Sequence, residues 1–340
     1  MIMEQYRAYE RKRRLLGYLL GGTVLLAVAV AVQLGALRLS LEDLLGNTVL
    51  WNIRLPRIIS AILVGAALGV SGAVMQCVLR NPLASPFTLG ISSGAAFGAA
   101  VAIVFFEAGR LNRTGLTGII IDNPYFISAF AFLSALGAVF VILALVKLKQ
   151  VTPTAMILAG VAMSSFFQAA TMLIQLFAED VKVAAVVFWT FGDVGRANWN
   201  EIGVMTAAFS VIFAHFLRKR WGFNVMLGGD EIAKSLGVEP SGFRLEVMVL
   251  ASLLTALSVS FAGIIGFVGL IAPHAVRLMI GADHRYLIPY SALLGALVLL
   301  LSDTVGRMAI SPAVIPVGII TAFVGVPVFL YLLVRSGSHA

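Results

Sequence analysis

Long apolar segments separated by short polar gaps recur along the whole chain. A helix that spans a bilayer needs about 20 mostly apolar residues, and ten segments approach or reach that length. They are Leu15–Ala36, Ile58–Leu79, Ser93–Glu107, Tyr125–Val146, Thr154–Phe177, Ile202–Leu217, Val247–Ala262, Ile264–Met279, Leu287–Leu301 and Ile315–Val334. The pattern predicts an all-α, polytopic membrane protein with about ten transmembrane helices, forming a single domain over residues 1–340.

The basic residues are unequally divided between alternate gaps. Sixteen of the 24 Lys and Arg residues fall in the set of gaps that includes the N-terminus, and eight fall in the other set. These eight are Arg38, Arg54, Arg57, Arg110, Arg113, Lys182, Arg196 and Arg307. Because cytoplasmic loops carry the excess of Lys and Arg, both termini are predicted to be cytoplasmic. That orientation requires an even number of spans.

The composition agrees with a chain surrounded by lipid. Apolar residues make up 60% and charged residues 12% of the sequence, whereas soluble domains carry roughly 25% charged residues. A soluble globular protein is therefore excluded. The net charge of +8 does not indicate nucleic-acid binding, because the basic residues lie in short gaps rather than on a water-facing domain. A single cysteine, Cys77, excludes an internal disulfide and a thiolate metal site.

The chain lacks a motif for nucleotide binding. No G-x-x-x-x-G-K-S/T sequence is present, and this loop cradles nucleotide phosphates in P-loop proteins. ATP and its Mg²⁺ would therefore be bound by a separate subunit, and the chain is predicted not to be an enzyme. The four histidines are scattered without H-E-x-x-H spacing, so we assign no catalytic residue, no metal ligand and no resident cofactor.

Two serine motifs leave open an intramembrane serine protease. Residues 69–72 have the sequence G-V-S-G and residues 90–94 have G-I-S-S-G, but a serine nucleophile needs a base within hydrogen-bond reach. His274 is the only histidine that we place within a span. Both motifs are common in membrane helices rich in glycine and serine, so this alternative is remote.

An Asp–Arg pair bears on a second alternative, a secondary transporter. Asp303 and Arg307 lie four residues apart near the outer end of a span, so they share one helix face and are predicted to form a structural ion pair. A proton-coupled transporter would bury more carboxylates in the centres of its helices. This alternative therefore has little support in the sequence.

Pairs of glycines four residues apart indicate close helix packing. Gly65 and Gly69 form one G-x-x-x-G motif, and Gly94 and Gly98 form another. Small residues let membrane helices approach closely. We expect these faces to pack within one bundle, with a subunit interface as the alternative.

The longest polar gap, residues 218–244, is predicted to be cytoplasmic. Within it, Asp230 and Glu231 open a short helical stretch and Gly237 ends it. A short helix at the cytoplasmic face is suited to docking a soluble partner.

Several stretches, in order over nearly the whole chain, resemble the permease subunits of type II ABC importers, the group that carries iron–siderophore complexes, heme and vitamin B12. The matching stretches are WNIRLPR (51–57), 65–99, LAGVAMS (158–164), LGGDEIAKSLGV (227–238), 263–303 and 315–333. The resemblance implies a homodimer of ten-helix subunits with a translocation path along the two-fold axis. It also implies two ATPase subunits below and an extracytoplasmic substrate-binding protein above.

The resemblance also implies a mechanism, a location and a cargo. ATP binding would draw the two ATPases together, and the permease would alternate between outward and inward access. The chain would be a multi-pass protein of the cytoplasmic (inner) membrane of a prokaryote. An iron–siderophore complex is the expected cargo, with heme or cobalamin as alternatives.

Roles in the family carry over to matching positions. Binding-protein docking would fall to Arg54, Arg57 and Arg307, and the cytoplasmic gate to Asn81, Leu83, Thr152 and Thr154. Coupling to the ATPase would fall to Gly228, Gly229, Asp230, Glu231, Ala233, Leu236 and Gly237. The side chains of Ala233 and Leu236 are expected to lie outside the bundle. Many family members carry a glutamate before the Ile-Pro of the last span, but here the residue is Val314, so no acidic role is assigned there.

Overall fold

The computed structural model describes residues 2–34, 48–108, 110–111, 119–120, 124–149, 152–310 and 313–337. Within these ranges, seven helical segments are long and apolar enough to span a membrane, and three shorter apolar helices accompany them. The seven comprise α1 (Ile2–Gln33), η2 (Leu50–Arg54) with α2 (Leu55–Val78), α4 (Pro124–Lys149), α5 (Pro153–Leu176), α7 (Trp199–Arg218), α10 (Pro240–Ala262) and α12 (His284–Met308). The three are α3 (Ile91–Phe105), α11 (Val268–Ile280) and α13 (Val317–Gly337).

Each of the ten predicted spans overlaps one of these ten helices, and the predicted fold class is confirmed. Short elements connect the spans at their ends. These elements are η3 (Pro86–Leu89), β1 (Arg110–Leu111), β2 (Ile119–Ile120), α6 (Asp180–Thr190), η4 (Val194–Arg196), α8 (Arg220–Met226) and α9 (Asp230–Ser235). Of the basic residues used to predict orientation, Arg38 and Arg113 lie outside the described residues.

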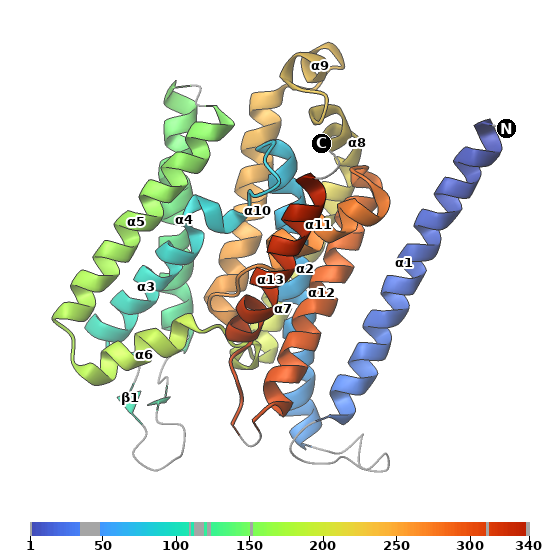
Figure 1. The fold of residues 1–340 in the computed structure, drawn as a ribbon. Helices are drawn as coiled ribbons and strands as arrows, with labels where there is room; N and C mark the ends of the chain where they lie inside the picture. Colours follow the sequence, from blue (N-terminus) through green and yellow to red (C-terminus); the bar gives the residue numbers. More distant parts are fainter. Residues whose placement is uncertain are drawn as a thin grey trace.

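The two ends of the described chain lie at the same end of the bundle. Figure 1 shows the start of α1, the end of α13 and α9 at one end, with α6 and β1 at the other. This arrangement agrees with an even number of crossings. Following the predicted orientation, we call the end with α9 the inner end and the end with α6 the outer end.

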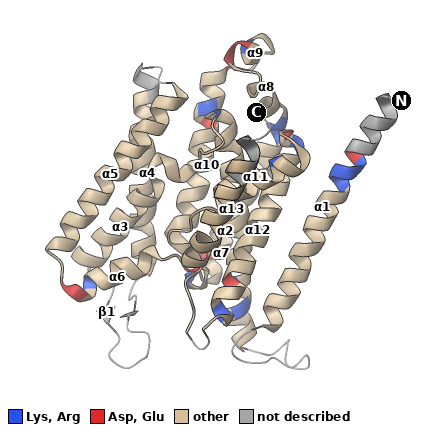
Figure 2. Ribbon diagram, viewed as in Figure 1, with Lys and Arg blue, Asp and Glu red and all other residues tan. Residues whose placement is uncertain are grey.

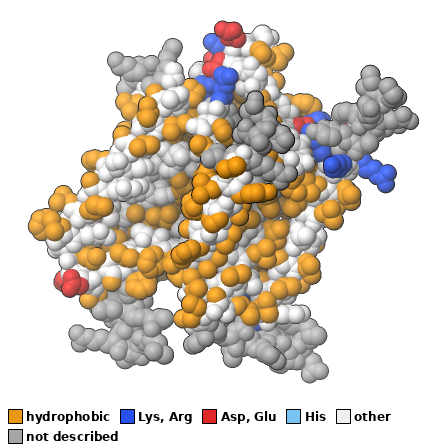
Figure 3. All heavy atoms as spheres, in the orientation of Figure 1, with side chains coloured by type: hydrophobic (Ala, Val, Ile, Leu, Met, Phe, Trp, Pro, Cys, Tyr) orange, Lys and Arg blue, Asp and Glu red, His pale blue; other side chains and the backbone are white. Residues whose placement is uncertain are grey.

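Charged and apolar residues are segregated along the bundle. Figure 2 shows Lys, Arg, Asp and Glu gathered toward the two ends, while the middle of the helices is almost free of them. In the space-filling view, hydrophobic side chains are spread over the face between the ends, and charged side chains are nearly absent from it (Figure 3). A broad apolar band between two charged ends is what a bilayer requires.

Helix α2 lies in the centre of the bundle, packed against α10, α11 and α12. Its glycines allow this packing, since a Cβ added at Gly65 would lie 2.4 Å from the Gly295 carbonyl oxygen, and one at Gly72 would lie 1.7 Å from that of Gly269. A Cβ at Gly98 of α3 would likewise lie 2.2 Å from the Phe130 carbonyl oxygen in α4. The two G-x-x-x-G faces therefore pack within the bundle of this chain, as expected, rather than at a subunit interface.

Helices α2 and α5 differ sharply in burial although both are strongly apolar. Within the chain, 83% of the apolar window containing α2 is buried, against 11% for α5. Two polar side chains in the middle of α5, Ser165 and Gln168, are exposed. A mid-span glutamine has no hydrogen-bond partner in lipid, so this face of α5 is better suited to a second protein chain or to water.

Candidate functional site

At the outer end, a buried aspartate joins two of the arginines that the sequence assigned to docking. Asp303 of α12 accepts from Arg57 Nε of α2 (2.8 Å) and from Arg307 Nε of its own helix (3.1 Å). The Asp303 side chain is fully buried, and the predicted ion pair with Arg307 is confirmed. Arg57 also lies 3.1 Å from Asp193, in the turn before η4. We call these four residues together with Arg54 the outer charge cluster.

Arg54 and Arg307 fix the end of α1. Arg54 Nη1 donates to the carbonyl oxygen of Val32 (2.7 Å), and Arg307 Nη1 donates to that of Leu34 (3.1 Å). The last carbonyls of a helix have no partner within the helix and carry a partial negative charge. The two guanidinium groups therefore cap α1, and all three predicted docking arginines are held by acceptors of their own chain.

At the inner end, α9 forms the short helix that the sequence predicted. Asp230 and Glu231 occupy its first turn, where acidic groups complement the helix dipole. Gly228 and Gly229 precede it, and Gly229 has a φ of 104° that favours glycine. At its end, Gly237 adopts a φ of 81°, and two backbone hydrogen bonds complete a Schellman motif. The predicted start and end of the helix are both confirmed.

Two of the predicted coupling residues, Ala233 and Leu236, lie in different surroundings. Leu236 is 64% exposed, as expected, but Ala233 is fully buried in the core with Phe223 and Met226. The expectation that Ala233 lies outside the bundle was wrong. Leu236 is the C-cap of α9, so the chain is already leaving the helix there, whereas Ala233 is on the face that packs against α8.

A buried arginine attaches α9 to the bundle. Arg244 of α10 donates from Nη2 to both carboxylate oxygens of Asp230 (3.0 and 3.2 Å). Its Nε donates to the carbonyl oxygen of Val78 at the end of α2 (2.9 Å). Asp230 is half-exposed while Arg244 is buried. The start of α9 is thereby linked to both α10 and α2.

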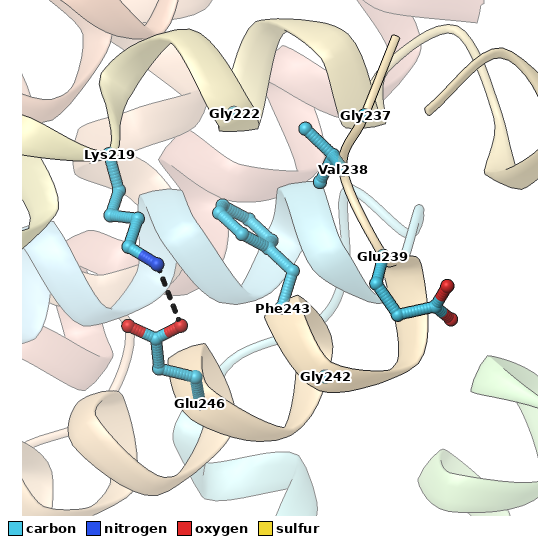
Figure 4. A pocket seen from close by; sticks show the side chains of 8 residues that line it. All are labelled: Lys219, Gly222, Gly237, Val238, Glu239, Gly242, Phe243 and Glu246. Atoms are coloured by element: carbon cyan, nitrogen blue, oxygen red, sulfur yellow. Dashed lines mark hydrogen bonds and ion pairs between the residues drawn. The ribbon is translucent and has the colours of Figure 1, made fainter. Parts of the chain in front are cut away.

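A groove of about 360 Å³ lies beneath the connection from α9 to α10. Figure 4 shows Lys219 extending toward Glu246, with Val238 and Phe243 beside them. Lys219 Nζ donates to Glu246 Oε2 (3.0 Å), and Glu246 Oε1 lies 2.5 Å from His215 Nε2. Lys219 and Glu246 therefore neutralise each other, and Glu239 adds a second carboxylate to the lining of the groove.

The four predicted gate residues lie in two segments at the inner end (Figure 1). Asn81 and Leu83 belong to the turn after α2, where the Leu83 amide donates to Asn81 Oδ1 (2.8 Å). Thr152 caps α5 by accepting from the amide of Ala155 (3.4 Å), and Thr154 follows in the first turn. The short helix η3, which follows Asn81 and Leu83, packs against α5 at Gly160, beyond Thr152 and Thr154. Leu83, Thr152 and Thr154 are exposed.

Sequence reasoning missed a second polar cluster, which fixes the inner end of α1. Asp283, the N-cap of α12, accepts from Arg13 of α1 (3.1 Å), from Asn224 of α8 (2.9 Å) and from Arg285. Burial alone would raise the pKa of Asp283, but the hydrogen bonds from Arg285 and Asn224 hold that pKa well below its usual range. Asp283 is one of only 16 acidic residues, and that scarcity was the signal that could have identified it.

Two of the groups that the protease alternative would need, Ser71 and His274, are buried in the packing of the bundle. The Ser71 hydroxyl is buried and donates to the carbonyl oxygen of Ala251 (3.2 Å). His274 is buried in α11. Among the described residues, no group of three or more His, Cys, Asp or Glu side chains could hold a metal ion. Val314, where a glutamate is common in the resembling family, is half-exposed before α13.

The model of the FecCD transport family matches residues 19–335. The chain belongs to the FecCD transport family. An ABC transporter permease protein of Methanocaldococcus jannaschii is 53% identical, and the match covers 98% of each chain. The hemin transport system permease protein HmuU of Yersinia pestis is 36% identical, over 95% of this chain and 96% of its own length. Other relatives are named for cobalamin, Fe(3+)-citrate and molybdate import.

A solved structure confirms the fold of this FecCD protein. It shows an inward-facing conformation of a metal-chelate type ABC transporter, with a TM-score of 0.82 and 32% sequence identity. The match covers 96% of this chain and 99% of that one. The resemblance inferred from the sequence motifs is thus confirmed at the level of family and fold, and the relatives are permease components rather than catalytic subunits.

Proposed function

We propose that this chain is the permease subunit of an ATP-driven ABC importer that moves a metal chelate into the cytoplasm by alternating access. The observation that carries the proposal is α9, a short capped helix at the inner end that exposes Leu236. A separate ATPase pair would bind ATP and Mg²⁺ and move this helix. The chain itself would contribute no catalytic group and no cofactor, and it would reside in the inner membrane of a prokaryote.

The translocation path is proposed to run between two copies of the chain. The face of α5 with Ser165 and Gln168 supports this, because exposed polar groups in mid-span suit a water-lined path. The gate residues Asn81, Leu83, Thr152 and Thr154 would close the inner mouth of that path. A homodimer would cover the apolar remainder of α5, which includes Phe166 and Met172.

An iron–siderophore complex is the proposed cargo, with heme and cobalamin as the alternatives. Relatives named for hemin, cobalamin and Fe(3+)-citrate support a metal chelate as the class. An extracytoplasmic binding protein would deliver it to the outer charge cluster, where its acidic residues would meet Arg54, Arg57 and Arg307. Mass spectrometry of the ligand that co-purifies with the binding protein distinguishes the three cargos.

Cross-linking at Leu236 tests the coupling role directly. The only cysteine, Cys77, is buried, so Leu236→Cys introduces a single accessible thiol. In native membranes we expect a thiol-reactive cross-linker to join this cysteine to a polypeptide with a P-loop. Phe177→Cys is the matched control, because Phe177 is 83% exposed just after the outer end of α5. Absence of the ATPase from the Leu236→Cys product, or equal cross-linking from both positions, would contradict the proposal.

A further inference from the structure

Arg57 lies between two carboxylates that hold it in different ways. Its Nε donates to Asp303 Oδ1 at 2.8 Å, and the Asp303 side chain is fully buried. Its Nη2 lies 3.1 Å from Asp193 Oδ1, and the Asp193 side chain is 31% exposed. Within the described residues, Nη2 is buried and makes no hydrogen bond, so the contact with Asp193 is an ion pair without hydrogen-bond geometry. Asp303 anchors Arg57, whereas Asp193 only neutralises it.

Breaking the ion pair between Asp193 and Arg57 should cost little stability. Its Oδ1 also accepts from the Gly195 amide (2.9 Å) as the cap of η4, so the carboxylate keeps a donor when the guanidinium leaves. Partly exposed ion pairs contribute little stability, whereas a buried pair that is broken costs much more. The Nη end of Arg57 is therefore exchangeable while its Nε remains fixed on Asp303.

We propose that Asp193 is an internal substitute for an acidic residue of the binding protein. Docking would replace Asp193 on Arg57 Nη2 with the partner's carboxylate, which satisfies the unmet hydrogen bond, while Asp303 holds the guanidinium in place. This inference rests on the proposed docking role of the outer charge cluster. Asp193 thus competes with the partner, and Asp303 is the positioning residue.

The exchange would act on a turn that is joined to two spans. The Asp193 amide donates to the carbonyl oxygen of Ala262 at the end of α10 (2.7 Å). The neighbouring Gly192 carbonyl accepts from the amide of Gly318 in α13 (3.3 Å). Loss of the Arg57 contact would therefore leave the Asp193 carboxylate without its cation, in a turn that is hydrogen-bonded to both helices.

Measuring the affinity of the binding protein for the assembled transporter in nanodiscs tests the inference. Asp193→Asn removes the competing charge and keeps the cap, so we expect docking about two- to five-fold tighter. Asp180→Asn is the control, since it makes the same change on exposed Asp180 at the start of α6. At 0.5 M salt the Debye length is only about 4 Å, so long-range effects of charge on docking are screened. The tighter docking should therefore persist for Asp193→Asn, whereas Asp180→Asn should dock with the affinity of the unsubstituted protein. Unchanged or weaker docking by the Asp193 variant would overturn the inference.

A double-mutant cycle separates this inference from the docking role itself. Arg57→Gln should weaken docking, and Asp193→Asn should have no effect in the Arg57→Gln background. If Arg57→Gln leaves docking unchanged, the proposed docking role of Arg57 fails. If Arg57→Gln weakens docking but Asp193→Asn does not tighten it in the wild-type background, only the competition by Asp193 fails.

Discussion

The two ends of this permease present their candidate docking groups in opposite ways. At the outer end, Arg54, Arg57 and Arg307 are mostly buried and bound to acceptors of their own chain. At the inner end, α9 exposes Leu236 and needs no internal contact to be broken before a partner binds. Under the proposed function, the inner surface suits lasting association with an ATPase, whereas the outer cluster suits a partner that binds, exchanges contacts and leaves.

The largest expected effect concerns the buried carboxylate of the outer charge cluster. Asp303→Asn would leave Arg57 and Arg307 buried without the carboxylate that they share, and breaking a buried pair costs about 3–5 kcal/mol. We expect a marked fall in the thermal unfolding midpoint of the purified protein. Asp180→Asn, on exposed Asp180, should change stability by less than about 1 kcal/mol. Equal shifts for the two variants would show that Asp303 is not a structural anchor.

Substitutions on α9 sharpen the contrast at the inner end. Ala233→Glu would force a carboxylate into a packed core and is expected to destabilise the fold by more than about 2 kcal/mol. Leu236→Glu changes an exposed side chain and should alter stability by less than about 0.5 kcal/mol, yet it should prevent ATPase association. Thermal unfolding and ATPase pull-down, measured on both variants, check this. If Leu236→Glu retains normal pull-down and uptake, α9 is only a connector.

The smallest expected effect concerns the attachment of α9. Asp230→Asn would remove the charge partner of Arg244, but Arg244 keeps its hydrogen bond to the Val78 carbonyl. Since Asp230 is half-exposed, the loss of stability should be below about 1 kcal/mol. Thermal unfolding of the variant alongside Asp303→Asn provides the comparison. If Asp230→Asn lowered stability as much as Asp303→Asn, the ion pair at the inner end would be as important to the fold as the buried pair at the outer end, which contradicts this account.

The sequence predicted the spans and α9 because their determinants are local. Apolar length identifies a membrane helix, and a glycine after a short polar helical stretch indicates the end of α9 because glycine readily adopts the positive φ that ends a helix. It did not predict that Ala233 is buried, or that Asp193 and Asp283 join residues far apart in the chain. Those contacts depend on how the spans pack, and no periodicity within one segment encodes which carboxylate meets which arginine across the bundle.

Uptake by reconstituted vesicles tests the proposed function most directly. Vesicles that contain the chain and its ATPase should accumulate the labelled chelate only with ATP on the ATPase side and the loaded binding protein on the opposite side. Vesicles that contain the chain alone should neither hydrolyse ATP nor accumulate the chelate under an imposed proton or sodium gradient. Uptake by the chain alone, driven by such a gradient, would contradict the account and identify a secondary transporter.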